Sequence, residues 1–167
     1  MKAVMKSVSP MREILFRGKR IDNNEWMYGD LIKNLIYDGR EKEIRIGDIY
    51  FEHNGDIHGT AVRKVIPETV GQFTGVCDKN GNKIFEGDIV KVTYTEKRQY
   101  QGISYQDEHS CVEEVIYNEK SACFMLKIMC EDIPLYRPLH NFGSLANIKE
   151  LEVIGNKWDN PELLEEI

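Results

Sequence analysis

Histidines and carboxylates at short spacing are the first residues in this chain that could hold a metal ion. His53 and His58 stand five residues apart in a polar stretch. Histidine pairs that bind metals usually lie two residues apart on a strand or four apart on a helix, whereas a spacing of five puts two side chains on opposite faces of a strand. Gly-Asp pairs followed by Leu or Ile supply further carboxylates at Asp30, Asp48, Asp56 and Asp88. A turn that enters a strand explains each pair separately, so the sequence predicts no metal site.

The segment that begins at Asp78 resembles a calcium-binding loop only in its first residues. Such a loop needs a glycine at its sixth position and a glutamate at its twelfth. Counted from Asp78, Gly81 comes too early and Ile89 takes the twelfth position. We therefore reject a calcium site and expect a hairpin, with Asn80-Gly81 forming a type I′ turn whose twist matches that of paired strands.

Cysteine spacing argues against a zinc or redox site. Cys77, Cys111, Cys123 and Cys130 form no C-x-x-C pair, and Cys123 and Cys130 lie on opposite faces of one expected strand. We expect reduced thiols that pack as small hydrophobic side chains. The motifs of serine hydrolases, nucleotide-binding proteins and zinc peptidases are also missing from the sequence. We therefore predict no catalytic residue, no cofactor-binding residue and no metal ligand.

Residues 95–110 contain a cluster suited to single-stranded nucleic acid, and the basic residues among positions 1–20 are a second candidate contact surface. Aromatic rings stack on bases and cations neutralise phosphates. The segment offers two of each, namely Lys97, Arg98, Tyr100 and Tyr105. Three acidic residues in the same segment outnumber its bases, so nucleic-acid binding is the weaker hypothesis. The segment is polar and lacks periodicity, which leaves a long variable loop or an extended hairpin arm open.

The residues named above lie in a chain whose sequence pattern predicts mostly β-strands. Alternating β-branched and aromatic residues predict closely spaced short strands, at residues 12–17, 26–36, 43–46, 59–66, 70–76, 89–94, 111–117, 122–130 and 149–155. Short strands separated by turns favour a barrel or a sandwich over alternating strands and helices. We expect a mainly β protein with a β-barrel-like core, long hairpins and a short C-terminal α-helix. Asp159 or Asn160 would cap that helix, Pro161 would begin it, and Leu163, Leu164 and Ile167 would form its apolar stripe.

Length and charge set the wider limits. The chain has 167 residues, enough for one domain with a sizeable core, and its net charge is −6. An acidic protein is poorly suited to nucleic acid or anionic membranes. No apolar stretch is long enough to span a bilayer or to act as a secretory signal. We expect residues 1–10 to be a disordered or alternative-start leader and residues 11–167 to be a single domain.

Four segments together resemble the YopX family of phages and prophages of Gram-positive bacteria. They are residues 11–20, 26–31, 70–90 and 153–164. The third, which runs from Val70 through Asn80-Gly81 to Val90, is the most specific. The resemblance implies a largely β fold with a barrel-like core, a mobile-element origin and a location in the bacterial cytoplasm, but no activity and no catalytic residues. Its motif residues are expected to be structural: Gly75, Asp78, Asn80, Gly81, Gly87, Asp88, Gly155, Asn156, Asn160 and Pro161.

Three classes of function stay open at this stage. The favoured one is a non-enzymatic protein-binding module that self-associates as a homo-oligomer or binds a host or phage protein, because catalytic motifs are missing, the chain is acidic and apolar residues remain at its C-terminal end. The second class is a single-stranded nucleic-acid-binding accessory protein or, as a variant, an acidic DNA mimic, and the third is an enzyme with an unrecognised carboxylate site. No cofactor is expected.

Overall fold

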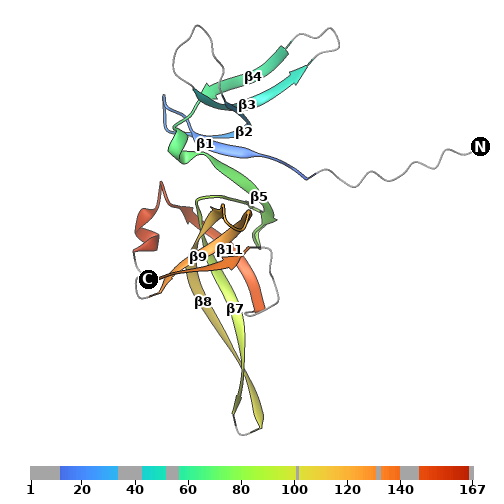
Figure 1. Ribbon diagram of the computed structural model, residues 1–167, viewed down its shortest axis with the longest axis vertical. Coiled ribbons are helices and arrows are strands. Elements are labelled where there is room, and N and C mark those ends of the chain that lie inside the picture. Colours follow the sequence, from blue (N-terminus) through green and yellow to red (C-terminus); the bar gives the residue numbers. More distant parts are fainter. Residues whose placement is uncertain are drawn as a thin grey trace, which may run out of the picture.

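A computed structural model describes residues 12–33, 43–51, 57–100, 102–130, 133–139 and 147–165. Strands dominate this part of the chain (Figure 1). The strands are β1 (Phe16–Lys19), β2 (Trp26–Lys33), β3 (Ile44–Phe51), β4 (Ile57–Lys64), β5 (Gly71–Cys77), β6 (Lys83–Phe85), β7 (Asp88–Tyr100), β8 (Ile103–Asn118), β9 (Cys123–Cys130), β10 (Ile133–Pro138) and β11 (Asn147–Asn156). Two 3-10 helices accompany them, η1 (Pro67–Thr69) and η2 (Pro161–Leu164). The prediction of a mainly β protein is therefore confirmed.

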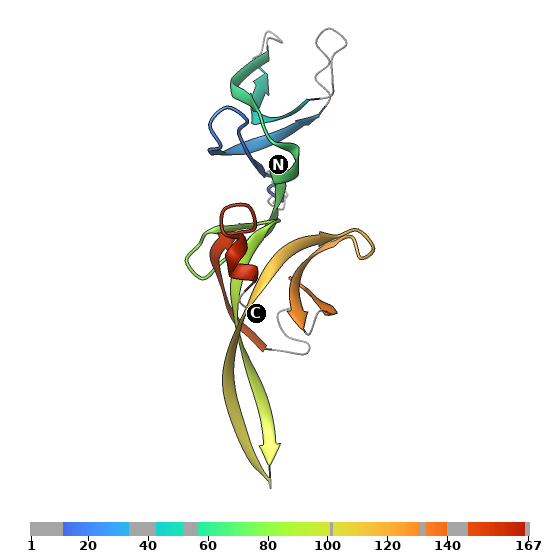
Figure 2. The ribbon, with the colours of Figure 1, turned by 90° about the vertical axis from the view of Figure 1, so that its left-hand side faces the viewer.

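The strands form two antiparallel sheets. The first sheet has the order β4-β3-β2-β1-β5-β6, and the second has the order β10-β9-β8-β7-β11. The first and last strands of each sheet differ, so the described strands form two open sheets, whereas the sequence predicted a β-barrel-like core. Figure 1 shows β1 to β4 at one end of the molecule and the second sheet below them, with β5 running from one to the other. Figure 2 shows how strongly the second sheet curls.

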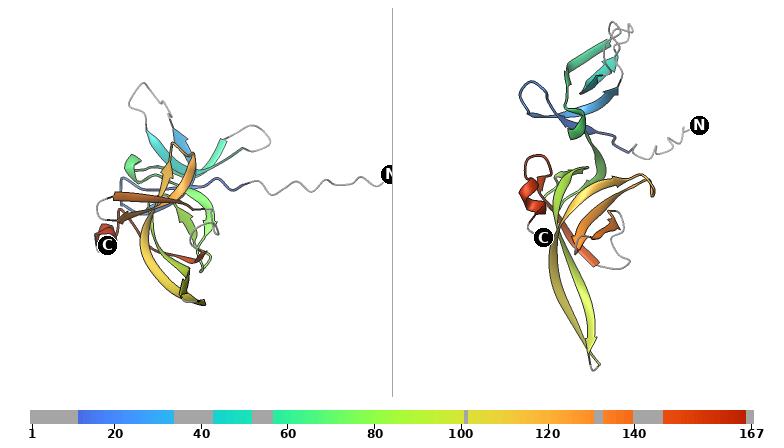
Figure 3. Two further views of the ribbon diagram at one scale, coloured as in Figure 1. Left: turned by 60° about the horizontal axis from the view of Figure 1, so that its bottom comes forward. Right: turned by 60° about the vertical axis from the view of Figure 1, so that its left-hand side comes forward.

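The hairpin of β7 and β8 is the longest feature of the second sheet (Figure 3). Its strands pair from Ile89 with Glu114 to Tyr100 with Ile103, whereas β11 follows β7 only as far as Thr95. The described residues of the 95–110 segment therefore form two strands with a turn at Gly102, so of the two alternatives left by the sequence, a loop or an extended hairpin arm, the structure has the arm. Beyond Thr95 these two strands are paired only with each other.

The main core lies against the curled second sheet. Its buried side chains are Ile84, Val90, Val92, Val115, Phe124, Leu126, Leu139 and Leu151. Strand alternation explains this set, because Val90 and Val92 share one face of β7 while Phe124 and Leu126 share one face of β9. The first sheet has a smaller core, in which Ile46 and Val65 pack over Gly18. At Gly18 a side chain would press on both, since an added Cβ would lie 3.0 Å from Ile46 Cδ1.

The predicted C-terminal α-helix is wrong. Residues Pro161–Leu164 form one 3-10 turn, in which the Leu163 N–H donates to the Asn160 carbonyl oxygen over 3.2 Å. Four residues cannot build the i to i−4 hydrogen bonds that stabilise an α-helix. Leu163 and Leu164 are half-buried rather than exposed. No helix in the described part of the chain is long and apolar enough to cross a membrane.

Candidate functional site

The motif residues around Asp78 shape a turn. The Asp78 carboxylate accepts hydrogen bonds from the Asn80 N–H and the Asn82 N–H, both over 2.8 Å, and from the Val153 N–H of β11 over 3.1 Å. Burial tends to raise the pKa of Asp78, but these hydrogen bonds outweigh it and lower the pKa. The turn is not type I′, because only Gly81 in it has a positive φ, of 84°. A type I′ turn needs a positive φ at both central residues, and the φ of Asn80, whose N–H is bonded to the Asp78 carboxylate, is not positive.

A second group of motif residues folds the end of the chain back onto the second sheet. The Asn156 side-chain oxygen accepts from the Trp158 N–H over 3.1 Å and from the Asp159 N–H over 3.0 Å. The Asn160 side-chain oxygen lies against Gly155, where an added Cβ would stand 2.6 Å from it. Asn160 makes no side-chain cap to η2, and Pro161 opens that turn. These residues position Trp158 and Asp159.

Of the remaining motif residues, Gly75 lies in β5, and Gly87 and Asp88 lie where β7 begins. Gly75 has a φ of 88° and Gly87 a φ of 81°, a conformation that favours glycine. At Gly87 the Trp158 ring covers the backbone, and an added Cβ would overlap it. The Asp88 carboxylate is 1 % exposed and accepts from the Phe85 N–H over 2.7 Å. The contacts of these motif residues described so far are hydrogen bonds to the backbone and close packing.

Arg17 joins the two sheets. Its guanidinium lies 2.6 Å from Asp88 Oδ1 and donates to the Glu86 carbonyl oxygen over 3.3 Å. It also lies over the rings of Trp26, at 4.7 Å, and Phe85, at 4.9 Å. Burial raises the pKa of Asp88 in spite of the adjacent Arg17 charge. An arginine keeps its charge under such conditions, so Asp88 and the two rings are what make its burial tolerable.

Asp159 makes a second link between the sheets. It pairs with Lys19 of β1, and its Oδ2 accepts from Trp26 Nε1 of β2 over 2.7 Å. The Trp26 and Trp158 rings meet edge to face, with centroids 5.6 Å apart. Burial works to raise the pKa of Asp159, but hydrogen bonds from Lys19, Asn156 and Trp26 outweigh it and lower the pKa to about 2. We call Arg17, Lys19, Trp26, Trp158 and Asp159 the latch.

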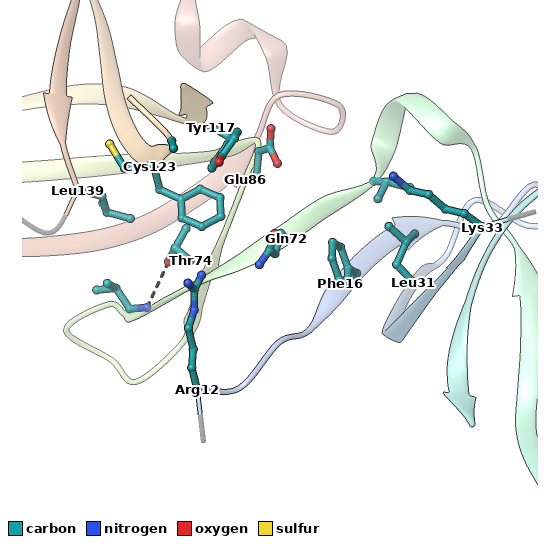
Figure 4. Close-up of a pocket in the computed structure, with 14 residues that line it drawn as sticks. Arg12, Phe16, Leu31, Lys33, Gln72, Thr74, Glu86, Tyr117, Cys123 and Leu139 are labelled. Carbon is teal, nitrogen blue, oxygen red and sulfur yellow. Dashed lines mark hydrogen bonds between the residues drawn. The ribbon is translucent and has the colours of Figure 1, made fainter. Parts of the chain in front are cut away.

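A groove lies between the sheets. Its volume is about 520 Å³, which is within the usual range of ligand sites. Figure 4 shows Phe16, Leu31 and Lys33 of the first sheet at one end, and Tyr117, Cys123 and Leu139 of the second sheet at the other. The lining residues are Arg12, Phe16, Leu31, Lys33, Val70, Gln72, Thr74, Val76, Glu86, Tyr117, Ala122, Cys123, Phe124 and Leu139. Strand β1 serves both features, because its alternation sends Phe16 to the groove and Arg17 to the latch.

Polar side chains also line the groove, and they include two cations and one acid. Arg12 and Lys33 are exposed, and neither forms an ion pair with a described residue. Glu86 is half-buried, and burial raises the pKa of its carboxyl. Thr74 donates its hydroxyl to the Ile84 carbonyl oxygen over 2.8 Å. The groove therefore offers a mixed surface, in which aromatic and aliphatic side chains lie among polar groups and two exposed cations have no ion-pair partner in the described part of the chain.

One buried polar cluster outside the groove has the composition of a thiol site. The Cys111 thiol donates to Glu113 Oε1 over 2.9 Å, and Arg137 pairs with the same carboxylate, which is fully buried. Burial raises the pKa of Cys111, although the Arg137 charge opposes it. A nucleophilic cysteine needs the opposite shift, because the thiolate is the reactive form. The cluster therefore has the character of a packed polar core rather than of an activated thiol.

The other chemistry suggested by the sequence is not assembled in the described part of the chain. His53 and Asp56 lie outside the described residues, and His58 lies on β4 opposite Tyr50 of β3, with its side chain outside the described part of the structure. Within those residues, no three His, Cys, Asp or Glu side chains come together as a metal site. The described thiols of Cys77, Cys111 and Cys123 are free, but Cys77 is exposed, so the prediction that the thiols pack as small hydrophobic side chains is wrong for Cys77.

The four candidate nucleic-acid contacts fall on the hairpin arm. Arg98 of β7 stands opposite Tyr105 of β8, and Tyr100 stands two residues beyond Arg98 on the same strand. The side chains of Lys97, Arg98, Tyr100 and Tyr105 lie outside the described part of the structure.

Sequence reasoning missed the groove and the latch. Phe16 and Arg17 are adjacent in a predicted strand, and nothing in their spacing shows that they face different partners. One clue was available in the two tryptophans, Trp26 and Trp158, because half-buried aromatic rings in a chain with so few tryptophans often mark a contact surface.

Comparison with known proteins places these features in a family. The family model described as YopX protein matches residues 15–165. A solved structure, the crystal structure of protein EF1440 from Enterococcus faecalis, has a similar fold with a TM-score of 0.50. The two chains are 22% identical, and the match covers 91% of this chain and 98% of that one. A search of curated proteins found no match. At this identity the likeness to EF1440 shows the fold alone.

Proposed function

Since the chain belongs to the YopX family, we propose that it is a phage- or prophage-encoded accessory protein of the bacterial cytoplasm. In this proposal it has no enzymatic activity and binds another polypeptide in the groove between its sheets. Self-association is the case in which that polypeptide belongs to a second copy. The groove lining carries this proposal. Aromatic and aliphatic side chains with a few polar groups at the rim are typical of surfaces that bind protein segments.

Tyr117 is an exposed aromatic residue in the groove that a partner could contact. Its side chain is 43 % exposed, and its ring meets Phe124 edge to face with centroids 5.4 Å apart. Tyrosine supplies a large contact area at a small entropic cost, which is why it is enriched at interfaces. A partner side chain that covered Tyr117 would also extend the apolar surface formed by Phe124 and Leu139.

The free edge of the second sheet is a weaker candidate surface. The Leu139 N–H donates to the Phe124 carbonyl oxygen of β9 over 3.0 Å. The backbone N–H and C=O groups of successive residues on an antiparallel strand point alternately toward and away from the neighbouring strand. At Pro134, Tyr136 and Pro138 of β10 the backbone groups therefore point away from β9. The two prolines have no N–H, which leaves Tyr136 as the outward donor among Pro134–Pro138 and disfavours the addition of a strand there. This supports the groove over the edge as the binding surface.

Sedimentation velocity with two matched variants tests the proposal. Tyr117 and Tyr136 are exposed to similar extents, 43 % and 46 %, but only Tyr117 lines the groove. We expect the unmodified chain to form dimers as its concentration rises. Tyr117→Glu should weaken this association about ten-fold, because a charge would enter the apolar surface, while Tyr136→Glu should leave it unchanged. A chain that stays monomeric at every concentration contradicts self-association, and equal effects of the two variants contradict the groove.

A further inference from the structure

The groove is elongated along one strand. Val70, Gln72, Thr74 and Val76 all line it, and they are alternate residues on and just before β5. At about 3.3 Å per residue, this row extends over roughly 20 Å. Because β5 runs from the first sheet to the second (Figure 1), the groove has the length of an extended peptide rather than the round shape of a pocket for a compact ligand.

The cations at the groove differ from the other basic residues of the first sheet. Most of those are paired: Arg17 with Asp88, Lys19 with Asp159, Arg20 with Asp22, and Arg45 and Lys64 with Glu43. Arg12 and Lys33 have no such carboxylate among the described residues. Exposed cations that no internal acid neutralises are available to an anionic partner.

One acid also lines the groove. Glu86 is half-buried, and burial raises the pKa of its carboxyl, so its charge opposes an anionic partner less than that of an exposed glutamate would. The Glu86 N–H donates to the Gln72 carbonyl oxygen over 2.9 Å, which keeps this residue at the groove wall.

Resting on the function proposed above, we infer that the groove binds an extended polypeptide segment in which apolar and acidic residues alternate. Its apolar side chains would contact Phe16, Tyr117 and Phe124, and its carboxylates would approach Arg12 and Lys33. The chain's own residues 1–11 fit poorly, because they contain two lysines and no acid. A nucleic acid fits poorly as well, because two rim cations on a protein of net charge −6 are few for a polyphosphate.

Fluorescence anisotropy with labelled peptides of about eight residues tests this inference on the full chain at low salt. One probe alternates leucine with glutamate, a second alternates leucine with lysine, and a third alternates serine with glutamate. We expect the leucine–glutamate probe to bind at least about ten-fold more tightly than either of the others. Equal or tighter binding of the leucine–lysine probe overturns the inference on charge, and equal binding of the serine–glutamate probe overturns it on the apolar contacts.

Variants identify the site. Arg12→Glu combined with Lys33→Glu should weaken binding of the leucine–glutamate probe about ten-fold, since each exposed charge pair adds little but two are reversed. Arg63→Glu is the control, because Arg63 is an exposed cation of the first sheet that does not line the groove. Unchanged circular dichroism shows that the variants fold. An equal loss in both variants overturns the assignment.

The two proposals fail differently. If Tyr117→Glu disrupts self-association and no probe binds, the groove is supported as a protein-binding surface, and the proposal of an alternating apolar and acidic segment is refuted. If the leucine–glutamate probe binds through Arg12 and Lys33 while the chain stays monomeric, binding of an alternating apolar and acidic segment is supported and self-association is refuted.

Discussion

Replacing Gly87 by alanine should test how the end of the chain is packed against the second sheet. Gly87 has a φ of 81°, and the Trp158 ring occupies the place that a side chain would take. Two costs therefore combine in Gly87→Ala. A left-handed backbone costs alanine roughly 1–2 kcal/mol, partly offset by the lower entropy of the unfolded chain. Displacing the ring from Gly87 and Trp26 costs about 2 kcal/mol more.

Gly81 is the matched control for this change. Its φ of 84° is nearly the same, but no atom lies within 4 Å of the place where its Cβ would stand. Gly81→Ala should therefore lower the free energy of unfolding by about 1 kcal/mol, and Gly87→Ala by about 3 kcal/mol. Urea denaturation followed by far-ultraviolet circular dichroism measures both, and it does not depend on the fluorescence of Trp158.

A double-mutant cycle separates the ring from the backbone. In a Trp158→Ala background, Gly87→Ala should cost only about 1 kcal/mol, because the ring that it displaces has gone. A cost that stays at about 3 kcal/mol in this background, or equal costs for Gly81→Ala and Gly87→Ala, would refute the packing of Trp158 on Gly87.

Three further changes test the links between the sheets and the free edge. Asp88→Ala should lower the free energy of unfolding, measured in urea, by about 3–5 kcal/mol, because it leaves the Arg17 charge buried alone. Asp88→Asn keeps an acceptor for the Phe85 N–H and should lower the free energy of unfolding less. Equal losses in the two variants would contradict the role of the charge. Asp159 has a lowered pKa, so it stabilises the fold above about pH 4, and this contribution is lost as the pH falls through about 2. Asp159→Asn should remove this contribution. At neutral pH the variant should unfold with a free energy about 1 kcal/mol lower than that of the unmodified chain, a value discounted for solvent exposure, and the difference should shrink toward pH 2. A difference that stays constant with pH would show that the charge is not responsible. Pro138→Val should restore an outward N–H on β10 and increase association in light scattering, whereas unchanged scattering would mean that proline does not protect this edge.

Local patterns explain what the sequence could predict. Strands β7 and β9 follow from alternating apolar residues, because one face of each covers the core. The turn at Asp78 follows from residues that hydrogen-bond their own backbone and from Gly81, which tolerates a positive φ. Even so, the predicted turn type was wrong, since the φ of Asn80 is not positive. The C-terminal helix failed for a related reason, because capping residues cannot sustain an α-helix of four residues.

The sequence by itself determined most of the strands, the position of the turn at Asp78 and the family, because these depend on residues close together in the chain. The groove and the latch depend on contacts between residues far apart, such as Arg17 with Asp88 and Lys19 with Asp159. No spacing rule relates those partners. Only the folded chain decides that Phe16 faces the groove while Arg17 is buried between two rings, because strand alternation predicts two faces but not what covers each of them.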